Sequence, residues 1–126
     1  MENKIIIPKP LEKSLNKMTE SLLESIELSG YLNAKNEFES DPLASNLMQD
    51  LSTAQSELLQ KQYQNQITQE DIQNIRNIQK NAQENEIFNS YIQSQQNAVA
   101  FLREVNDQIS QLIGMDFASL AKNTKC

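Results

Sequence analysis

Apolar residues repeat at steps of three and four along most of this chain, which is the spacing of one face of an α-helix. The longest repeat lies toward the C-terminal end and is interrupted by a single glutamine. Its members are Phe88, Tyr91, Gln95, Ala98, Leu102, Val105, Ile109 and Leu112. We call this repeat the α-helical seam. It predicts one long helix over residues 86–113, with the heptad pattern of a coiled coil.

Shorter repeats predict two helices in the first third of the chain. A stripe of five apolar residues places the first helix over residues 11–28: Leu11, Leu15, Met18, Leu22 and Ile26. Ser29-Gly30 is expected to interrupt it, because glycine is costly inside a helix and serine is a good N-cap. A short helix is then expected over residues 31–40.

Cap residues predict where two further helices begin. Asp41-Pro42 opens a helix over residues 42–64, since aspartate accepts hydrogen bonds from free backbone N–H groups and proline has no N–H to leave unused. Thr68 caps the next helix, which carries acidic residues in its first turn. The apolar stripe of that helix is out of phase with the seam, so a boundary is predicted near Asn85.

The domain organisation follows from these breaks. We expect an irregular N-terminal tail over residues 1–10, a single helical domain over residues 11–113, and a C-terminal tail over residues 114–126. Gly114 is a natural helix stop, and the apolar residues after it can fold back onto the bundle. The fold class predicted is all-α, with about five helices and the long ones packed as an elongated antiparallel bundle with coiled-coil-like seams.

The predicted length of the last helix favours an oligomer. A helix of about 28 residues is roughly 42 Å long, whereas a compact domain of this size has a radius of gyration near ~14 Å. Such a helix overhangs its own domain, and its seam is expected to be completed by a second copy. A homodimer is the simplest closed arrangement.

Composition excludes most chemistry. The chain has no His, one Cys and a net charge of −6. Triads that need histidine, Cys/His zinc sites and disulfide frameworks are therefore excluded, and we expect a protein that is not an enzyme. The acidic balance disfavours direct nucleic-acid binding. The longest apolar run, residues 98–102, is far shorter than the ~20 residues of a membrane span. The expected compartment is the cytoplasm.

Two remaining features are candidates for function. Between residues 20 and 60 lie eight acidic residues and one basic residue, and Glu37, Glu39 and Asp41 form the candidate partner face within this acidic segment. The simpler interpretation is a solvated surface. Cys126, the single cysteine, cannot by itself hold a metal cluster, which needs about four ligands. No cofactor is therefore expected.

The order of these breaks and repeats resembles that of the YlbF/YmcA/YheA family of small all-helical bacterial proteins. The resemblance covers residues 11–113 and rests on the combined order of helix punctuation: Ser29-Gly30-Tyr31, Asp41-Pro42-Leu43-Ala44, Thr68-Gln69-Glu70-Asp71, Asn85 ahead of Tyr91, and Val105-Asn106. The chain departs from the family in having Glu86 where proline often follows Asn85.

The resemblance implies five helices, self-association and a regulatory role without catalysis. Some members belong to a complex that modulates the endoribonuclease RNase Y, and through it mRNA maturation, competence, sporulation and biofilm formation. Members of that complex are associated with an iron–sulfur cluster held by cysteines, for which this chain offers only Cys126. The YheA-like branch has no defined role. The alternative is an acidic, chaperone-like module that holds a client helix in an apolar groove.

Overall fold

The computed structural model describes residues 4–122 as an all-helical protein. Within that range the elements are α1 (Lys9–Glu24), α2 (Ile26–Ser40), α3 (Pro42–Tyr63), α4 (Gln69–Gln83), α5 (Glu86–Ile113) and α6 (Phe117–Lys122). The described residues contain no strand. The predicted all-α fold with long antiparallel helices is thus confirmed.

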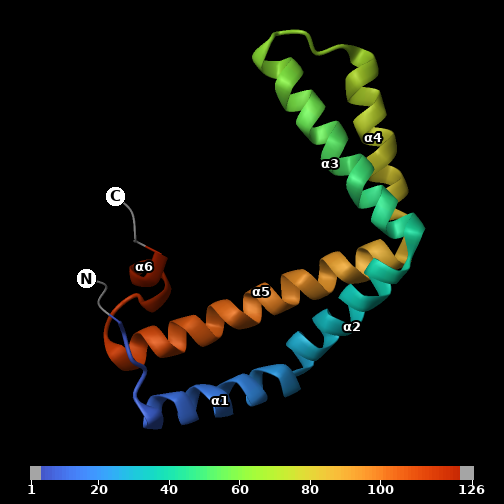
Figure 1. Ribbon diagram of the computed structural model, residues 1–126. Coiled ribbons are helices and arrows are strands. Elements are labelled where there is room, and N and C mark those ends of the chain that lie inside the picture. Colours follow the sequence, from blue (N-terminus) through green and yellow to red (C-terminus); the bar gives the residue numbers. More distant parts are fainter. Residues whose placement is uncertain (1–3, 123–126) are drawn as a thin grey trace.

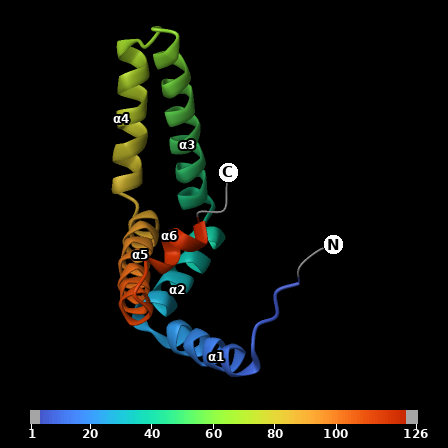
Figure 2. The same cartoon turned by 90° about the vertical axis from the view of Figure 1, so that its left-hand side faces the viewer.

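The helices form two arms that meet at an angle (Figure 1). The hairpin arm consists of α3 and α4, which lie side by side in both views (Figures 1 and 2). The long arm consists of α5 with α2 packed along its first half, α1 continuing from α2, and α6 at the far end of α5. The molecule is elongated because these arms extend away from one another.

An aromatic cluster at the elbow joins the two arms. The ring of Phe38 on α2 stacks on that of Tyr91 on α5, with centroids 4.4 Å apart, and meets the edge of Phe88 at 6.3 Å. Ala44 from α3 and Ala82 from α4 complete the buried cluster. Four helices therefore contribute to one small core, and this core fixes the angle between the arms.

The predicted caps around the elbow and the hairpin are confirmed. The carboxylate of Asp41 accepts a hydrogen bond from the N–H of Ala44 at 3.2 Å, and the side chain of Asn85 accepts one from Phe88 at 2.8 Å. Gly114 ends α5 in the left-handed conformation, with φ of 75°, which a glycine adopts without steric cost. The bounds predicted for α5 agree with those observed.

The first break between helices does not lie where the sequence predicted it. It lies at Ser25, and Gly30, which was expected to interrupt the helix with Ser29, lies inside α2. The Ser25 hydroxyl accepts a hydrogen bond from Leu28 N–H at 3.2 Å, which caps α2 one turn earlier than predicted. The helix count also rises from about five to six, because residues of the predicted C-terminal tail form α6.

The core is small for a chain of this length. The described residues include only seven buried apolar side chains, two of them phenylalanine. The exposed surface measures 10334 Å², against about 6,800 Å² for a compact monomer of this mass. Two helices, α1 and the short α6, have no buried residue at all. Much apolar surface is thus left open by the single chain.

Candidate interaction surfaces

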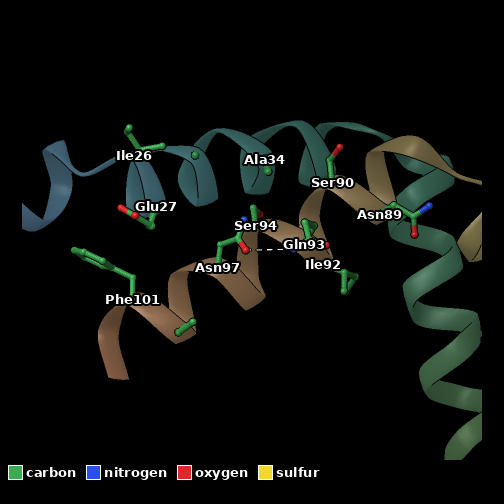
Figure 3. Close-up of a pocket in the computed structure, with 12 residues that line it drawn as sticks. Ile26, Glu27, Ala34, Asn89, Ser90, Ile92, Gln93, Ser94, Asn97 and Phe101 are labelled. Carbon is green, nitrogen blue, oxygen red and sulfur yellow. Dashed lines mark hydrogen bonds between the residues drawn. The ribbon is translucent and has the colours of Figure 1, made fainter. Parts of the chain in front are cut away.

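A groove with a volume of about 1100 Å³ lies between α2 and α5 (Figure 3). It begins next to the α1–α2 break and follows α5 for half its length. Its lining residues are Ile26, Glu27, Gly30 and Ala34 from α2, and Asn89, Ser90, Ile92, Gln93, Ser94, Asn97, Ala100 and Phe101 from α5.

The groove combines apolar and amide side chains. Ile26 on α2 and Phe101 on α5 lie toward its α1 end, while Gln93 and Asn97 share the side formed by α5 (Figure 3). The Gln93 amide donates to the Asn97 side chain at 3.2 Å, which holds both amides in place. A channel with apolar patches and hydrogen-bonding groups along its rim suits an amphipathic helix.

The α-helical seam divides into an inner and an outer half. In the inner half, Phe88 and Ala98 are buried and Tyr91 is half-buried within the chain, whereas Gln95 is exposed. The outer half comprises Leu102 and Leu112, which are exposed, and Val105 and Ile109, which are half-buried. The inner half therefore packs inside the chain. A role of the seam in oligomerisation stays a prediction.

A polar atom lies beside the outer half of the seam. The side-chain oxygen of Asn106 is buried and has no hydrogen-bond partner within the described residues. A buried acceptor without a partner is unfavourable by about 1–3 kcal/mol. A hydrogen bond from the Phe117 N–H to the Ser110 hydroxyl, at 3.0 Å, holds α6 at this end of α5. Even with α6 in place, the Asn106 oxygen has no partner within the described residues.

The candidate partner face lies near the elbow, and only some of its carboxylates are available to bind a partner. Glu37 is exposed, whereas Glu39 lies 3.9 Å from the ammonium group of Lys35. Asp41 is half-buried and serves as the cap of α3. The structure brings these three carboxylates onto one short stretch at the end of α2, but one of them has a structural role.

An ion pair closes the tip of the hairpin arm. The Lys61 ammonium lies 2.6 Å from the Asp71 carboxylate, and Asp71 also accepts a hydrogen bond from Thr68 N–H at 2.9 Å. The hydrogen bond from Lys61, followed by that from Thr68, lowers the pKa of Asp71 from 3.8 to about 2. The same hydrogen bond raises the pKa of Lys61.

This ion pair predicts an acid-sensitive hairpin. Because the folded-state pKa of Asp71 is lowered, its stabilisation is present above 3.8 and is lost as pH falls through about 2. In Asp71→Asn, circular dichroism across an acid titration is expected to show a smaller decrease in stability between these two pH values than in the parent. Equal decreases in both proteins would contradict this. Glu70→Gln, next to it in sequence, is the control.

The described residues offer neither a metal-ligand cluster nor a membrane-spanning helix. Within residues 4–122, no group of three or more His, Cys, Asp or Glu side chains is arranged to hold a metal ion. Cys126 lies outside the described residues. No helix in the described part of the chain is long and apolar enough to cross a membrane.

The groove is the surface that sequence reasoning missed. Ile92 and Phe101 do not belong to the α-helical seam, so the heptad pattern passed over them. The signal that could have revealed the groove is the pair of small residues Gly30 and Ala34, four positions apart and therefore on one helix face. Because Gly30 was interpreted as a helix break, Gly30 and Ala34 were not placed on the same helix face.

Comparison with known families gives one match. Residues 11–113 match the family described as "Control of competence regulator ComK, YlbF/YmcA". No curated protein and no solved structure gives a significant match to the chain. The matched range begins within α1 and ends at the last residue of α5, so it takes in both arms, the elbow and the groove.

Proposed function

Because the chain belongs to the YlbF/YmcA family, we propose that it is a non-catalytic regulatory protein that acts as an adaptor through contacts with other proteins. The family description links its members to control of the competence regulator ComK. By resemblance, the process in which this chain acts is RNase Y-dependent mRNA processing. The observation that carries the proposal is the match over residues 11–113.

The chemistry of the chain supports a role without catalysis. It has no histidine, the side chain that most often transfers protons near neutral pH. The features that it does have are surfaces: a groove between α2 and α5, the partly exposed outer half of the seam and the candidate partner face. Such surfaces suit binding of other helices. With Cys126 as the single cysteine, we propose that the adaptor works without an iron–sulfur cluster.

Affinity capture from the native bacterium tests the adaptor role. The tagged full chain is expected to retain RNase Y and the proteins that accompany it. Retention of an unrelated set of clients, without any ribonuclease, would overturn the proposal in favour of the chaperone-like alternative. Messenger RNA cleavage patterns in a strain that lacks the protein provide the second measurement, and unchanged patterns would also contradict the proposal.

A second prediction concerns the candidate partner face. The variant Glu37→Lys, Glu39→Lys, Asp41→Asn removes the charge but keeps an asparagine cap on α3. Capture of the ribonuclease complex is expected to weaken several-fold and to lose its salt dependence, because electrostatic steering of a basic partner is removed. Binding at several ionic strengths, measured on immobilised protein, gives the result.

A matched variant separates position from net charge. Glu70→Lys, Glu104→Lys, Asp107→Asn makes the same charge change on exposed residues at the tip of the hairpin arm and in the second half of α5, away from that face. The control is expected to bind as the parent does. If both variants bind equally, the acidic segment contributes only its overall charge, and the partner contact lies elsewhere.

A further inference from the structure

The first helix has an apolar face that none of residues 4–122 covers. Leu11, Leu15 and Met18 repeat at steps of four and three along α1, and each is exposed, Leu15 by 41%. No residue of α1 is buried, and α1 makes no contact with α5. An amphipathic helix of 16 residues gains most of its stability from packing. Its face therefore requires a partner.

The groove between α2 and α5 is a surface of the same chain that could take such an apolar helix. Ile26, at its end, is 86% exposed although it is one of the largest apolar residues lining the groove. A Cβ atom placed on Gly30 would meet nothing within 4 Å, so the chain itself does not use the space that this glycine opens. Glycine inside a helix costs roughly 1 kcal/mol relative to alanine. The open position lets another backbone approach α2 closely.

The chain cannot readily place its own α1 in this groove, because Ser25 fixes the direction of α1. The N–H and the hydroxyl of Ser25 both donate to the carbonyl of Leu22, at 3.1 and 2.6 Å, and the same hydroxyl accepts from Leu28 at 3.2 Å. One residue thus ends α1 and begins α2. Turning α1 onto α5 would break these hydrogen bonds, so the occupant comes from outside the chain.

The exposed area points to a second copy as that occupant. The surface of 10334 Å² exceeds the value for a compact monomer by roughly 3,500 Å² per chain. A stable interface buries about 1,200–2,000 Å² in total, so the excess supplies an interface with area to spare. Each copy offers one free helix and one free groove, which a two-fold axis pairs into a closed dimer.

We propose that α1 of one copy lies in the α2/α5 groove of a second copy, and that the second copy's α1 lies in the groove of the first. The lengths agree: α1 spans about 24 Å, and the part of α5 that lines the groove spans about 18 Å. The apolar stripe of α1 covers Ile26 and Phe101, and the amides of Gln93 and Asn97 form the rim. The inference concerns self-association alone and does not depend on the proposed regulatory function.

Crosslinking between two differently tagged chains tests the pairing. In a Cys126→Ser background, one chain carries Leu15→Cys on the apolar stripe of α1 and the other carries Ala100→Cys in the groove. A short bifunctional maleimide is expected to join them. Because each chain has a single cysteine, a product that contains both tags is intermolecular. The control is Glu20→Cys, on the opposite face of the same helix, which is expected to yield several-fold less product.

Three outcomes would overturn the proposal. The first is equal yield from Leu15→Cys and Glu20→Cys. The second is an intrachain product from the double variant Leu15→Cys, Ala100→Cys in a monomer, which would assign the groove to the chain's own α1. The third is a monomer of the parent at micromolar concentration with no crosslink, which would leave the groove to a different protein.

Sedimentation of α1 variants gives an independent measurement. Leu15→Asp is expected to raise the dimer dissociation constant at least ~100-fold, since the dimer contains the substituted helix twice. Asn16→Asp adds the same charge at the adjoining polar position and is expected to leave it nearly unchanged. Asn16→Asp is expected to retain the helical signal of the parent, and Leu15→Asp to lose at most the signal of α1 itself, because α1 buries nothing within the chain and the other helices fold without it. Equal dissociation constants for the two variants would contradict the proposal.

Discussion

Replacing Phe38 with alanine is expected to lower the free energy of unfolding by about 3–5 kcal/mol, a large part of the stability of a domain of this size. Phe38 is 9% exposed and meets both Phe88 and Tyr91. Removing the ring leaves a cavity in this packed cluster, and such a cavity lowers stability beyond the loss of buried apolar surface. Urea unfolding followed by circular dichroism measures the loss.

The matched control is Phe117→Ala on α6. Phe117 is the same residue type but is 47% exposed, so its replacement is expected to cost less than about 1 kcal/mol. Small-angle scattering of Phe38→Ala should also show a broader range of arm angles, since the elbow core sets that angle. Similar losses for the two variants would show that the elbow is not the principal core.

Aspartate at Ala98 and at Leu102 is expected to have opposite consequences, although these seam positions are one helical turn apart. Ala98 is 5% exposed, and a buried, unpaired carboxylate costs about 3–5 kcal/mol. Ala98→Asp is therefore expected to unfold the chain. Leu102 is 42% exposed, so Leu102→Asp is expected to keep the helical spectrum and to weaken self-association. Thermal melts and sedimentation distinguish the two effects.

This pair of variants separates folding from assembly on one helix face. If Leu102→Asp unfolds the chain as Ala98→Asp does, the outer seam is needed for the fold of the single chain. If Leu102→Asp leaves self-association unchanged, the outer seam is no part of the contact between copies. The first result would contradict the division of the seam into inner and outer halves, and the second would contradict the predicted role of the outer half in self-association.

Local sequence signals predicted most helix ends because the caps act locally. Asp41, Thr68 and Asn85 each bond to a backbone N–H three residues later, whatever the rest of the chain does. The bounds of α3 and α5 follow from these contacts and from Gly114. The phase difference between the apolar stripes of α4 and α5 also indicated the boundary at Asn85, where no proline or glycine marks it.

The first break could not be placed from sequence because two serines compete for it. Ser25 and Ser29 are equally good caps, and Gly30 favours Ser29 on propensity. The structure instead extends α2 through Gly30, which lengthens its contact with α5. Packing against a helix some 60 residues later in the sequence outweighs a local preference of roughly 1 kcal/mol.

Local sequence patterns could not predict the elbow or the groove either. Helical periodicity tells which face of a helix is apolar but not which of its neighbours covers that face. Phe38 and Phe88 lie 50 positions apart on α2 and α5, and the hairpin arm joins their cluster through Ala44 and Ala82, contacts that no local pattern indicates. The groove depends on how α2 packs along α5 and on the point at which Ser25 ends α1.

The length of the hairpin arm can change during evolution without disturbing the core at the elbow. Its two helices run outward from the elbow and return, and their tip touches no other part of the described chain. Seven residues added to each helix would extend the arm by about 10 Å and restore the same apolar face. The reach of the arm can therefore change by paired insertions while the elbow and the groove keep their sequences. Length variation among relatives should accordingly concentrate on both sides of the loop at residues 64–68.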